Sequence, residues 1–371
     1  MSGHSWRLMR VMGIDVRIDP SWLIIAALVS TSLFFGLSVV YPNVETVVAA
    51  AISILGAVLF FASVLVHELM HAVVARRRGF TVKDITLYLF GGATRANIES
   101  KGAADEFIVS VVGPITSLAL AVVFWIARGA VISVEDGALA GILGYLAWAN
   151  TLLGVFNLLP GLPLDGGRVL RSVLWKSTGN LDRATKIASA AGEVLGYGLI
   201  VLGVLLFFAG AIFQGLWFAA IGWFLATSAR ASYTEMRMRR ALEHVEAVDV
   251  MEANPHRIPA GTTIAAAVNE YMLRHDNDAF AIEDTGRVVG VVTLGSVRKV
   301  RKADWTTRRI AEVMTPVMDA NLVDPHTPMD VVLERFEGAA DSIVVGDRDH
   351  VVGVITSWDL SVWLRRRALA A

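Results

Sequence analysis

The sequence predicts a polytopic α-helical membrane protein with about six transmembrane helices, followed by a smaller α/β domain. Three observations predict this fold class. The 371 residues are 55% hydrophobic with a mean hydropathy of +0.57, which is too apolar for a soluble globular protein. Before Arg240, several apolar runs are long enough to span a bilayer. After Arg240 such runs stop, charged residues become frequent, and two similar units follow.

A transmembrane helix needs about 20 consecutive, mostly apolar residues to cross the hydrocarbon core of a bilayer. Six apolar runs fit this requirement, at residues 22–40, 47–75, 106–127, 137–159, 188–211 and 215–228. The last run is short, and only residues 212–214 separate it from the run before it. The final pair is therefore predicted to form a tight helical hairpin. We assign residues 1–230 to this six-helix domain.

Lys and Arg are distributed unevenly between the connections. They are frequent before the first run and after the second, fourth and sixth runs, whereas the first and fifth connections have none and the third has only Arg128. Cytoplasmic loops carry an excess of these residues. We therefore expect a multi-pass protein of the cell membrane with both termini in the cytoplasm. No small-residue cleavage site follows the first apolar run, so no cleaved signal peptide is expected.

Composition also limits the partners and ligands. The net charge is −1, so no nucleic-acid partner is expected. The chain has no cysteine, so disulfides and thiolate metal ligands are excluded. A metal site would have to be built from His, Asp or Glu.

The second apolar run contains His67, Glu68 and His71. Two histidines four residues apart lie on one face of a helix and can bind the same zinc ion. Glu68 is then placed to take a proton from water at the metal. The histidines are the only two between Met9 and Arg240. Ionisable residues at membrane depth are costly and usually functional; the alternative is a polar helix end with hydrogen-bonded histidines.

Two histidines leave a catalytic zinc one protein ligand short of the usual three. Asp165 is an acid among apolar residues after the fourth run, in a segment with two prolines and several glycines. Irregular backbone at membrane depth is tolerated where it lines a cavity. Asp165 could instead only cap the next helix. Glu193, in the fifth run, is the competing third ligand, a second-shell group, or a structural polar contact between helices.

These motifs together resemble the site-2 protease family of intramembrane zinc metalloproteases. The resemblance covers about residues 10–230. It rests on the HExxH segment at 61–79 and on Asn157, Pro160, Pro163 and Asp165-Gly-Gly, with further similarity at Phe90-Gly91-Gly92, Gly113-Pro114, Met12-Gly13-Ile14 and Pro20-Ser21-Trp22.

The resemblance implies one Zn²⁺ per chain, bound by His67, His71 and Asp165. It makes Glu68 the catalytic base and lets Asn157 hold the substrate or the oxyanion. It implies a membrane-associated β hairpin over residues 83–94, whose edge could pair with an unwound substrate. The implied substrates are transmembrane segments of single-pass proteins, such as an anti-sigma factor, cut in regulated intramembrane proteolysis.

The C-terminal part begins with a charged helical linker at residues 231–246. Two similar units follow, at 247–303 and 310–368. Met251 and Gly290 are separated by the same 39 positions as Met314 and Gly353. In each unit an apolar helix pattern precedes two short strands, and a helix start follows the second strand. This spacing predicts an internal repeat.

The two units resemble a tandem pair of CBS domains, which often binds adenine nucleotides such as ATP or AMP between the repeats. Thr356 and Asp359 match the ribose-contacting positions of that family. The first repeat has Thr293, but Ser296 stands where the family has Asp, which puts one of the two nucleotide sites in doubt. The alternative is a CBS pair that serves only to form a homodimer.

The favoured interpretation is a zinc metalloendopeptidase of the site-2 type, in contact with membrane lipid and regulated by a cytoplasmic CBS module. One alternative is a non-catalytic membrane receptor with a structural metal site, which would not need Glu68. Another is a CBS-regulated membrane transporter, whose intramembrane acids would not need an HExxH helix.

Overall fold

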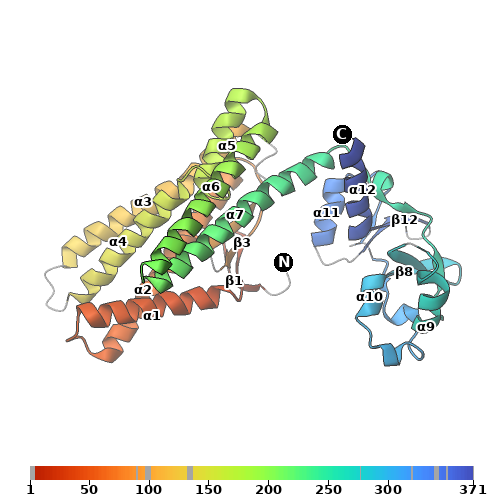
Figure 1. Cartoon of the computed structure of the whole chain (residues 1–371), viewed down its shortest axis with the longest axis horizontal. Coiled ribbons are helices and arrows are strands. Elements are labelled where there is room, and N and C mark those ends of the chain that lie inside the picture. The colour runs from red at the N-terminus through yellow and green to blue at the C-terminus, as the bar shows by residue number, and fades with distance from the viewer. Residues whose placement is uncertain are drawn as a thin grey trace. The chain divides into compact units, whose positions relative to one another are not determined.

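The computed structural model describes residues 5–88, 91–96, 102–131, 137–275, 277–318, 321–337, 342–347 and 350–370. The chain divides into two compact units, Met1–Met236 and Arg237–Ala371. Figure 1 shows long helices in the first unit and short strands with short helices in the second. Each unit is described by itself below.

The first unit is built on long apolar helices. Six of the helices in the described part of the chain are long and apolar enough to cross a membrane: α1 (Trp22–Val40), α2 (Thr46–Arg77), α3 (Ala103–Val131), α4 (Ala138–Asn157), α6 (Leu181–Phe208) and α7 (Ile212–Ala241). The predicted fold class of a polytopic α-helical membrane protein is confirmed.

The sixth apolar run, at 215–228, lies within a longer helix that also includes residues 231–241 of the predicted helical linker. Helix α7 has 30 residues, and the link to α6 consists of residues 209–211, with Gly210 at a φ of +89°. The apolar run stops where Arg230 and later charged residues begin, but the helical backbone does not have to stop there. Lys, Arg and Glu are good helix formers, so α7 continues through them.

A four-stranded sheet accompanies these helices, with strand order β1-β2-β3-β4. Its strands are β1 (Trp6–Val11), β2 (Ile14–Ile18), β3 (Val82–Tyr88) and β4 (Gly91–Ala96). The pair β3–β4 is antiparallel, as expected for residues 83–94; Phe90 lies outside the described residues. The sequence did not predict the N-terminal hairpin β1–β2. It adds to the sheet through the parallel pairing of β2 with β3, and the backbone carbonyl of Met12 accepts a hydrogen bond from Arg76 at the end of α2.

One further helix, α5 (Asp165–Thr178), follows the proline-containing segment after α4. Sequence analysis anticipated only a helix start at this point. Its buried residues include Gly166, Gly167, Arg171 and Ser172, while other positions are exposed. It is an amphipathic helix that packs on α3 and α6 and is too short to cross a bilayer.

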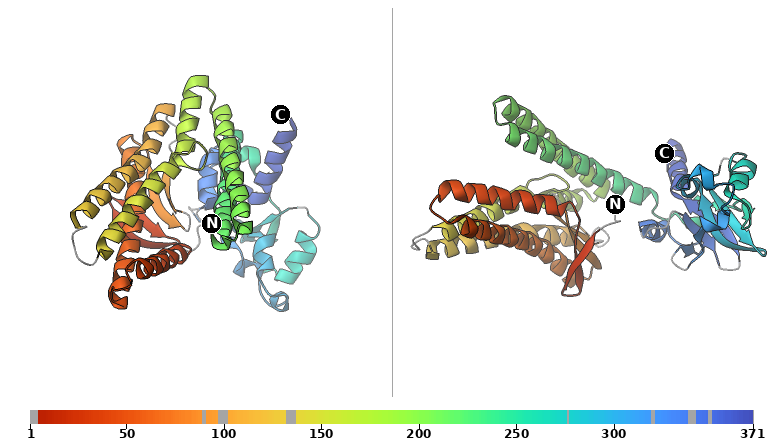
Figure 2. Two further views of the ribbon diagram at one scale, coloured as in Figure 1. Left: turned by 60° about the vertical axis from the view of Figure 1, so that its left-hand side comes forward. Right: turned by 90° about the horizontal axis from the view of Figure 1, so that it is seen from below.

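Helices α6 and α7 run side by side as a hairpin (Figure 2). Glycines let their backbones approach closely. A Cβ atom added to Gly196 would lie 2.7 Å from the carbonyl oxygen of Gly222, and one added to Gly203 would lie 2.6 Å from that of Gly215. Small residues allow such contacts in membranes, where van der Waals packing drives helix association.

The second unit contains two four-stranded sheets with orders β6-β7-β8-β9 and β10-β11-β12-β5. The strands are β5 (Glu252–Ala253), β6 (Arg257–Pro259), β7 (Ala279–Asp284), β8 (Arg287–Thr293), β9 (Thr315–Pro316), β10 (Leu322–Val323), β11 (Ser342–Gly346) and β12 (Val351–Thr356). The helices are α8 (Ala247–Val250), α9 (Ile264–Ala267), α10 (Leu294–Arg298), α11 (Met329–Glu337) and α12 (Ser357–Ala370), with a π-helical turn at Val268–Met272 and 3-10 turns at Lys302–Asp304 and Ile310–Glu312.

The two repeats exchange their first strands. Strand β5 of the first repeat pairs with β12 of the second, and β9 of the second repeat pairs with β8 of the first. As a result, a Cβ atom added to Gly353 would lie 2.3 Å from Sδ of Met251, and one added to Gly290 would lie 2.5 Å from Sδ of Met314. The equal spacing seen in the sequence therefore reflects contacts of each methionine with the other repeat's glycine.

We expect Gly196→Ala to destabilise the first unit by about 1–3 kcal/mol, because the added methyl group would press on the backbone of α7. Thermal unfolding of the full chain in detergent would measure this loss. Gly198→Ala is the matched control in the same helix, since a Cβ atom there would meet nothing within 4 Å. Equal unfolding temperatures for the two variants would contradict the packing described here.

Candidate metal centre

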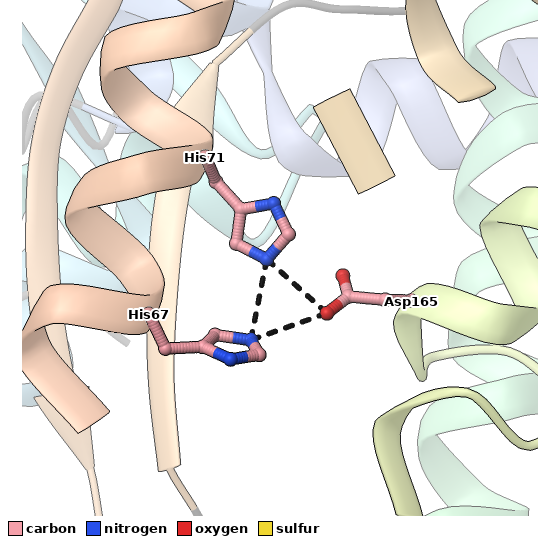
Figure 3. Close-up of side chains that lie close together, drawn as sticks. All are labelled: His67, His71 and Asp165. Atoms are coloured by element: carbon pink, nitrogen blue, oxygen red, sulfur yellow. Dashed lines mark hydrogen bonds and ion pairs between the residues drawn. The ribbon is translucent and has the colours of Figure 1, made fainter. Parts of the chain in front are cut away.

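Three side chains meet between α2 and α5. His67 and His71 lie one turn apart on α2 and are 3% and 6% exposed, and Asp165 is the first residue of α5. Figure 3 shows the three side chains pointing toward one another. Oδ2 of Asp165 lies 3.2 Å from Nε2 of His67 and 3.1 Å from Nε2 of His71. The two Nε2 atoms are 3.3 Å apart.

These distances fit a zinc site. Zinc–ligand bonds of roughly 2.0–2.1 Å in tetrahedral geometry place neighbouring donor atoms about 3.3 Å apart. Nδ1 of His71 lies 2.6 Å from the carbonyl oxygen of Val109, which can only accept, so that nitrogen carries a proton. In the neutral ring, Nε2 then presents a lone pair to the carboxylate oxygen. A cation between these acceptor atoms would relieve their repulsion.

Helix α3 contacts the Nδ1 atoms of both histidines, whose Nε2 atoms face Asp165. Oγ of Ser117 lies 2.9 Å from Nδ1 of His67, and Val109 holds His71 as described. Between them, Gly113 leaves room for the imidazoles, since a Cβ atom there would lie 2.1 Å from Nε2 of His71. Such outer contacts set the tautomer and the ring orientation of metal-binding histidines.

The segment between α4 and α5 leads to Asp165, and close backbone contacts fix the position of this segment. The amide of Leu162 donates to the carbonyl oxygen of Ala188 on α6, at 3.0 Å. A Cβ atom on Gly192 would lie 1.9 Å from the Leu162 carbonyl oxygen, and one on Gly167 would lie 2.2 Å from the carbonyl carbon of Gly161. The glycines are needed here because any side chain would push the segment away.

Glu68 follows His67 on α2 and is half-buried. Strand β4 passes directly against it, since a Cβ atom on Gly92 would lie 2.4 Å from Cγ of Glu68. Within the described sheet, β4 is an edge strand. The Glu68 side chain therefore lies against the strand whose outer edge has no partner in that sheet.

The other predicted residues of this domain lie outside the three-residue group. Asn157 is the last residue of α4, and its side-chain amide donates to the carbonyl oxygen of Leu153 in its own helix, at 2.9 Å. Glu193 accepts from Nε of Arg230 on α7, at 2.7 Å. Among the described residues, the only group of three His, Cys, Asp or Glu side chains close enough to hold a metal is His67, His71 and Asp165. Glu193 is thus an interhelical contact here.

The predicted nucleotide residues lie in the second unit. Oδ2 of Asp359 accepts from the backbone amide and from Oγ1 of Thr356, at 2.8 and 2.7 Å, at the start of α12. In the first repeat, Thr293 and Ser296 form the corresponding cap at the start of α10. Burial raises the pKa of Glu252 and of Asp278, and the nearby charge of Asp359 raises each pKa further.

Sequence reasoning missed the supporting residues on α3. Gly113 was noted as part of a family-like pair, but neither its contact with the histidines nor the role of Ser117 was expected. The Val109 contact uses a backbone carbonyl, which leaves no trace in residue type. The signal that was available is the small residues at 113 and 117, four apart on one helix face.

We expect Gly113→Ala to weaken zinc binding strongly while the chain still folds, because the methyl group would occupy the space of the imidazoles. Zinc content of the purified full chain, measured by elemental analysis beside its unfolding temperature, tests this. Gly129→Ala is the control on the same helix, because nothing lies within 4 Å of a Cβ atom there. Full zinc content in Gly113→Ala would show that the arrangement described here is wrong.

Comparisons with known proteins agree with the geometry. The profile of peptidase family M50 matches residues 55–134 and 128–199, and that of the CBS domain matches 247–303 and 310–366. The chain is 36% identical to "Putative zinc metalloprotease Rip3" of Mycobacterium tuberculosis over 356 residues, covering 95% of this chain and 91% of the relative. It is 27% identical to zinc metalloprotease MJ0392 of Methanocaldococcus jannaschii, covering 96% and 95%.

A solved site-2 protease from Methanocaldococcus jannaschii aligns with a TM-score of 0.44 at 27% identity, covering 62% of this chain and 95% of that one. Identity above 30% along nearly the whole of both chains, together with the family matches, decides the assignment. This chain belongs to peptidase family M50, the site-2 proteases, as a multi-pass membrane metalloprotease with a tandem CBS pair.

Proposed function

We propose that the protein is a zinc metalloendopeptidase that hydrolyses peptide bonds within transmembrane segments of single-pass membrane proteins. The observation that carries this proposal is the group of His67, His71 and Asp165 with Glu68 next to His67, in which the two buried histidines lie on a helix of membrane-spanning length. A structural zinc site is normally closed by four protein ligands. Three ligands and an adjacent carboxylate suit a catalytic site instead.

The chemistry divides between the metal and the chain. When bound, zinc would lower the pKa of water and polarise the carbonyl of the substrate. Glu68 accepts a proton from the attacking water and donates it to the leaving amine. Ser117 and Val109 keep the two imidazoles oriented for this work. A non-catalytic receptor would not need Glu68 at this position, and a transporter would not need the three converging ligands.

A helical substrate must unwind before its peptide bonds can be attacked, since its backbone groups are paired within the helix. The outer edge of β4 is suited to hold an unwound segment by adding it as a further strand. The contact between Gly92 and Glu68 supports this, because it puts the edge strand beside the proposed base. We place Asn157 in contact with the substrate; it is the last residue of α4, directly before the segment that leads to Asp165.

The proposed orientation follows the basic connections. The Arg76–Arg78 end of α2 and the connection that contains α5 would lie on the cytoplasmic side, together with both termini and the CBS pair. A single-pass membrane regulator, such as an anti-sigma factor, is the proposed kind of substrate, and a homodimer through the CBS units is the proposed assembly. Membrane lipid would surround the apolar helices.

We expect Glu68→Gln to lower the cleavage rate by about 100-fold or more, because the neutral amide cannot act as a base, while zinc content stays at the wild-type level. Cells expressing either form would be compared by mass spectrometry for new peptide termini inside transmembrane segments. Such termini should occur only with wild type.

Glu193→Gln is the matched control, since Glu193 is also an acid of a membrane-spanning helix but pairs with Arg230. It should retain both zinc and cleavage. Cleavage that persists in Glu68→Gln would overturn the role assigned to Glu68. If Glu68→Gln also lost its zinc, the missing metal would explain the loss of cleavage, and the result would not support Glu68 as the base.

We also propose that the CBS pair binds an adenine nucleotide, with Thr356 and Asp359 at the ribose. A carboxylate is suited to accept hydrogen bonds from ribose hydroxyls. Glu252 and Asp278 lie close enough to Asp359 to shift in pKa with its charge. Because these acids would repel phosphate groups, we expect AMP to bind more tightly than ATP in the absence of a divalent cation.

Asp359→Ser tests this site without removing the helix cap, because Oγ of Ser296 accepts from the amide of Thr293 in the same way in the first repeat. We expect about tenfold or greater loss of AMP affinity, since hydrogen bonds to a charged acceptor contribute roughly 1.5–3 kcal/mol. Isothermal calorimetry on the full chain measures this, with Ser296→Ala as the control. Unchanged AMP affinity in Asp359→Ser would refute the assignment.

A further inference from the structure

A second buried polar group joins α3 to α5 beside the metal centre. Glu106 of α3 is 0% exposed and Arg171 of α5 is 4% exposed. Nε of Arg171 donates to Oε1 of Glu106 at 2.8 Å, and its NH2 group donates to the same oxygen. Nε of Arg168 lies 3.9 Å from that atom. Neither Glu106 nor Arg171 is needed as a metal ligand or as a base in the proposed reaction.

Glu106 belongs to the same face of α3 as the residues that support the histidines. Glu106, Val109, Gly113 and Ser117 follow one another at intervals of three and four residues, which is the spacing of a single helix face. Going along this face, α3 contacts α5 through Glu106, His71 through Val109, and His67 through Ser117. One helix thus touches both of the elements that carry the three candidate ligands.

Arg171 is six residues after Asp165 on α5, which is about 9 Å along the helix axis. A rigid helix that is held at Arg171 is therefore also held at Asp165. The other support of Asp165 is the backbone contact of the Leu162 segment with α6. The ion pair adds a direct connection to α3, which is the helix that also orients the histidines.

We propose that Glu106 and Arg171 are positioning residues, whose ion pair sets the place of Asp165 relative to His67 and His71. A buried ion pair contributes little net stability, because desolvation of both charges offsets their attraction. Two N–H groups of Arg171 converge on one oxygen of Glu106, and these directional hydrogen bonds restrict how the two helices can slide or rotate. The pair would therefore act on the geometry of the metal site more than on the stability of the bundle.

This inference rests on the proposed function only through the metal site, so its test reads out metal binding. Glu106→Met combined with Arg171→Met removes both charges and fills the space with apolar side chains. We expect zinc affinity, measured by competition with a chelator, to fall about 10- to 100-fold, as for other residues behind metal ligands. The visible absorption of bound Co²⁺ should change as well, while the unfolding temperature of the metal-free chain stays close to that of wild type.

Glu193→Met combined with Arg230→Met is the matched control, because it removes the Arg–Glu pair between α6 and α7. It should leave zinc affinity and the Co²⁺ spectrum unchanged. A folded Glu106/Arg171 double variant whose zinc affinity is within twofold of wild type would overturn the inference. So would an equal loss of affinity in the control pair.

If the double variant does not fold, Arg171→Lys decides the question. Lysine keeps the charge but lacks the planar fork, so we expect weaker zinc binding at an unchanged unfolding temperature; unchanged affinity would count against the inference. Peptide cleavage by wild type is assayed in parallel. Wild type that binds zinc but cleaves no substrate would contradict the proposed function and leave the positioning role intact.

Discussion

Polar groups that lie among apolar helices must find their partners inside the protein, since lipid offers none. This requirement shapes the whole membrane unit. His67 and His71 are paired with Asp165 in front and with Ser117 and the Val109 carbonyl behind. Glu106, on the same helix α3, accepts a hydrogen bond from the charged Arg171 of α5. The arrangement of α2, α3 and α5 therefore gives each of these side chains a partner inside the protein, although Oε2 of the buried Glu106 has no hydrogen-bond partner among the described residues.

Residue type and spacing predicted part of the candidate metal site. Two histidines four apart share a helix face by geometry alone, and the absence of cysteine left only an acid as third partner. Choosing between Asp165 and Glu193 required the tertiary structure, because both acids lie in apolar surroundings in the sequence. The choice depends on Arg230, which is 37 residues from Glu193 along the chain and pairs with it across the α6–α7 hairpin.

The long apolar helices were predictable because membrane thickness sets a minimum length for them. Elements without such a requirement were predicted less well. The β1–β2 hairpin mixes arginines with apolar residues and gains its place only by pairing with β3, which is 64 residues or more further on. The apolar run at 215–228 gave only part of α7, because hydropathy reports where lipid ends, whereas the helix ends where backbone hydrogen bonding ends.

The strand exchange in the second unit has a consequence for the order in which the protein can fold during synthesis. Strand β5 is the first strand of the second unit to be synthesised, but its partner β12 is synthesised about a hundred residues later. The first sheet lacks its last strand until β9 has been made. A chain that stops after one repeat would expose open sheet edges, which are sites for unwanted pairing with other chains. Neither sheet can therefore be completed until strands from both repeats have been made.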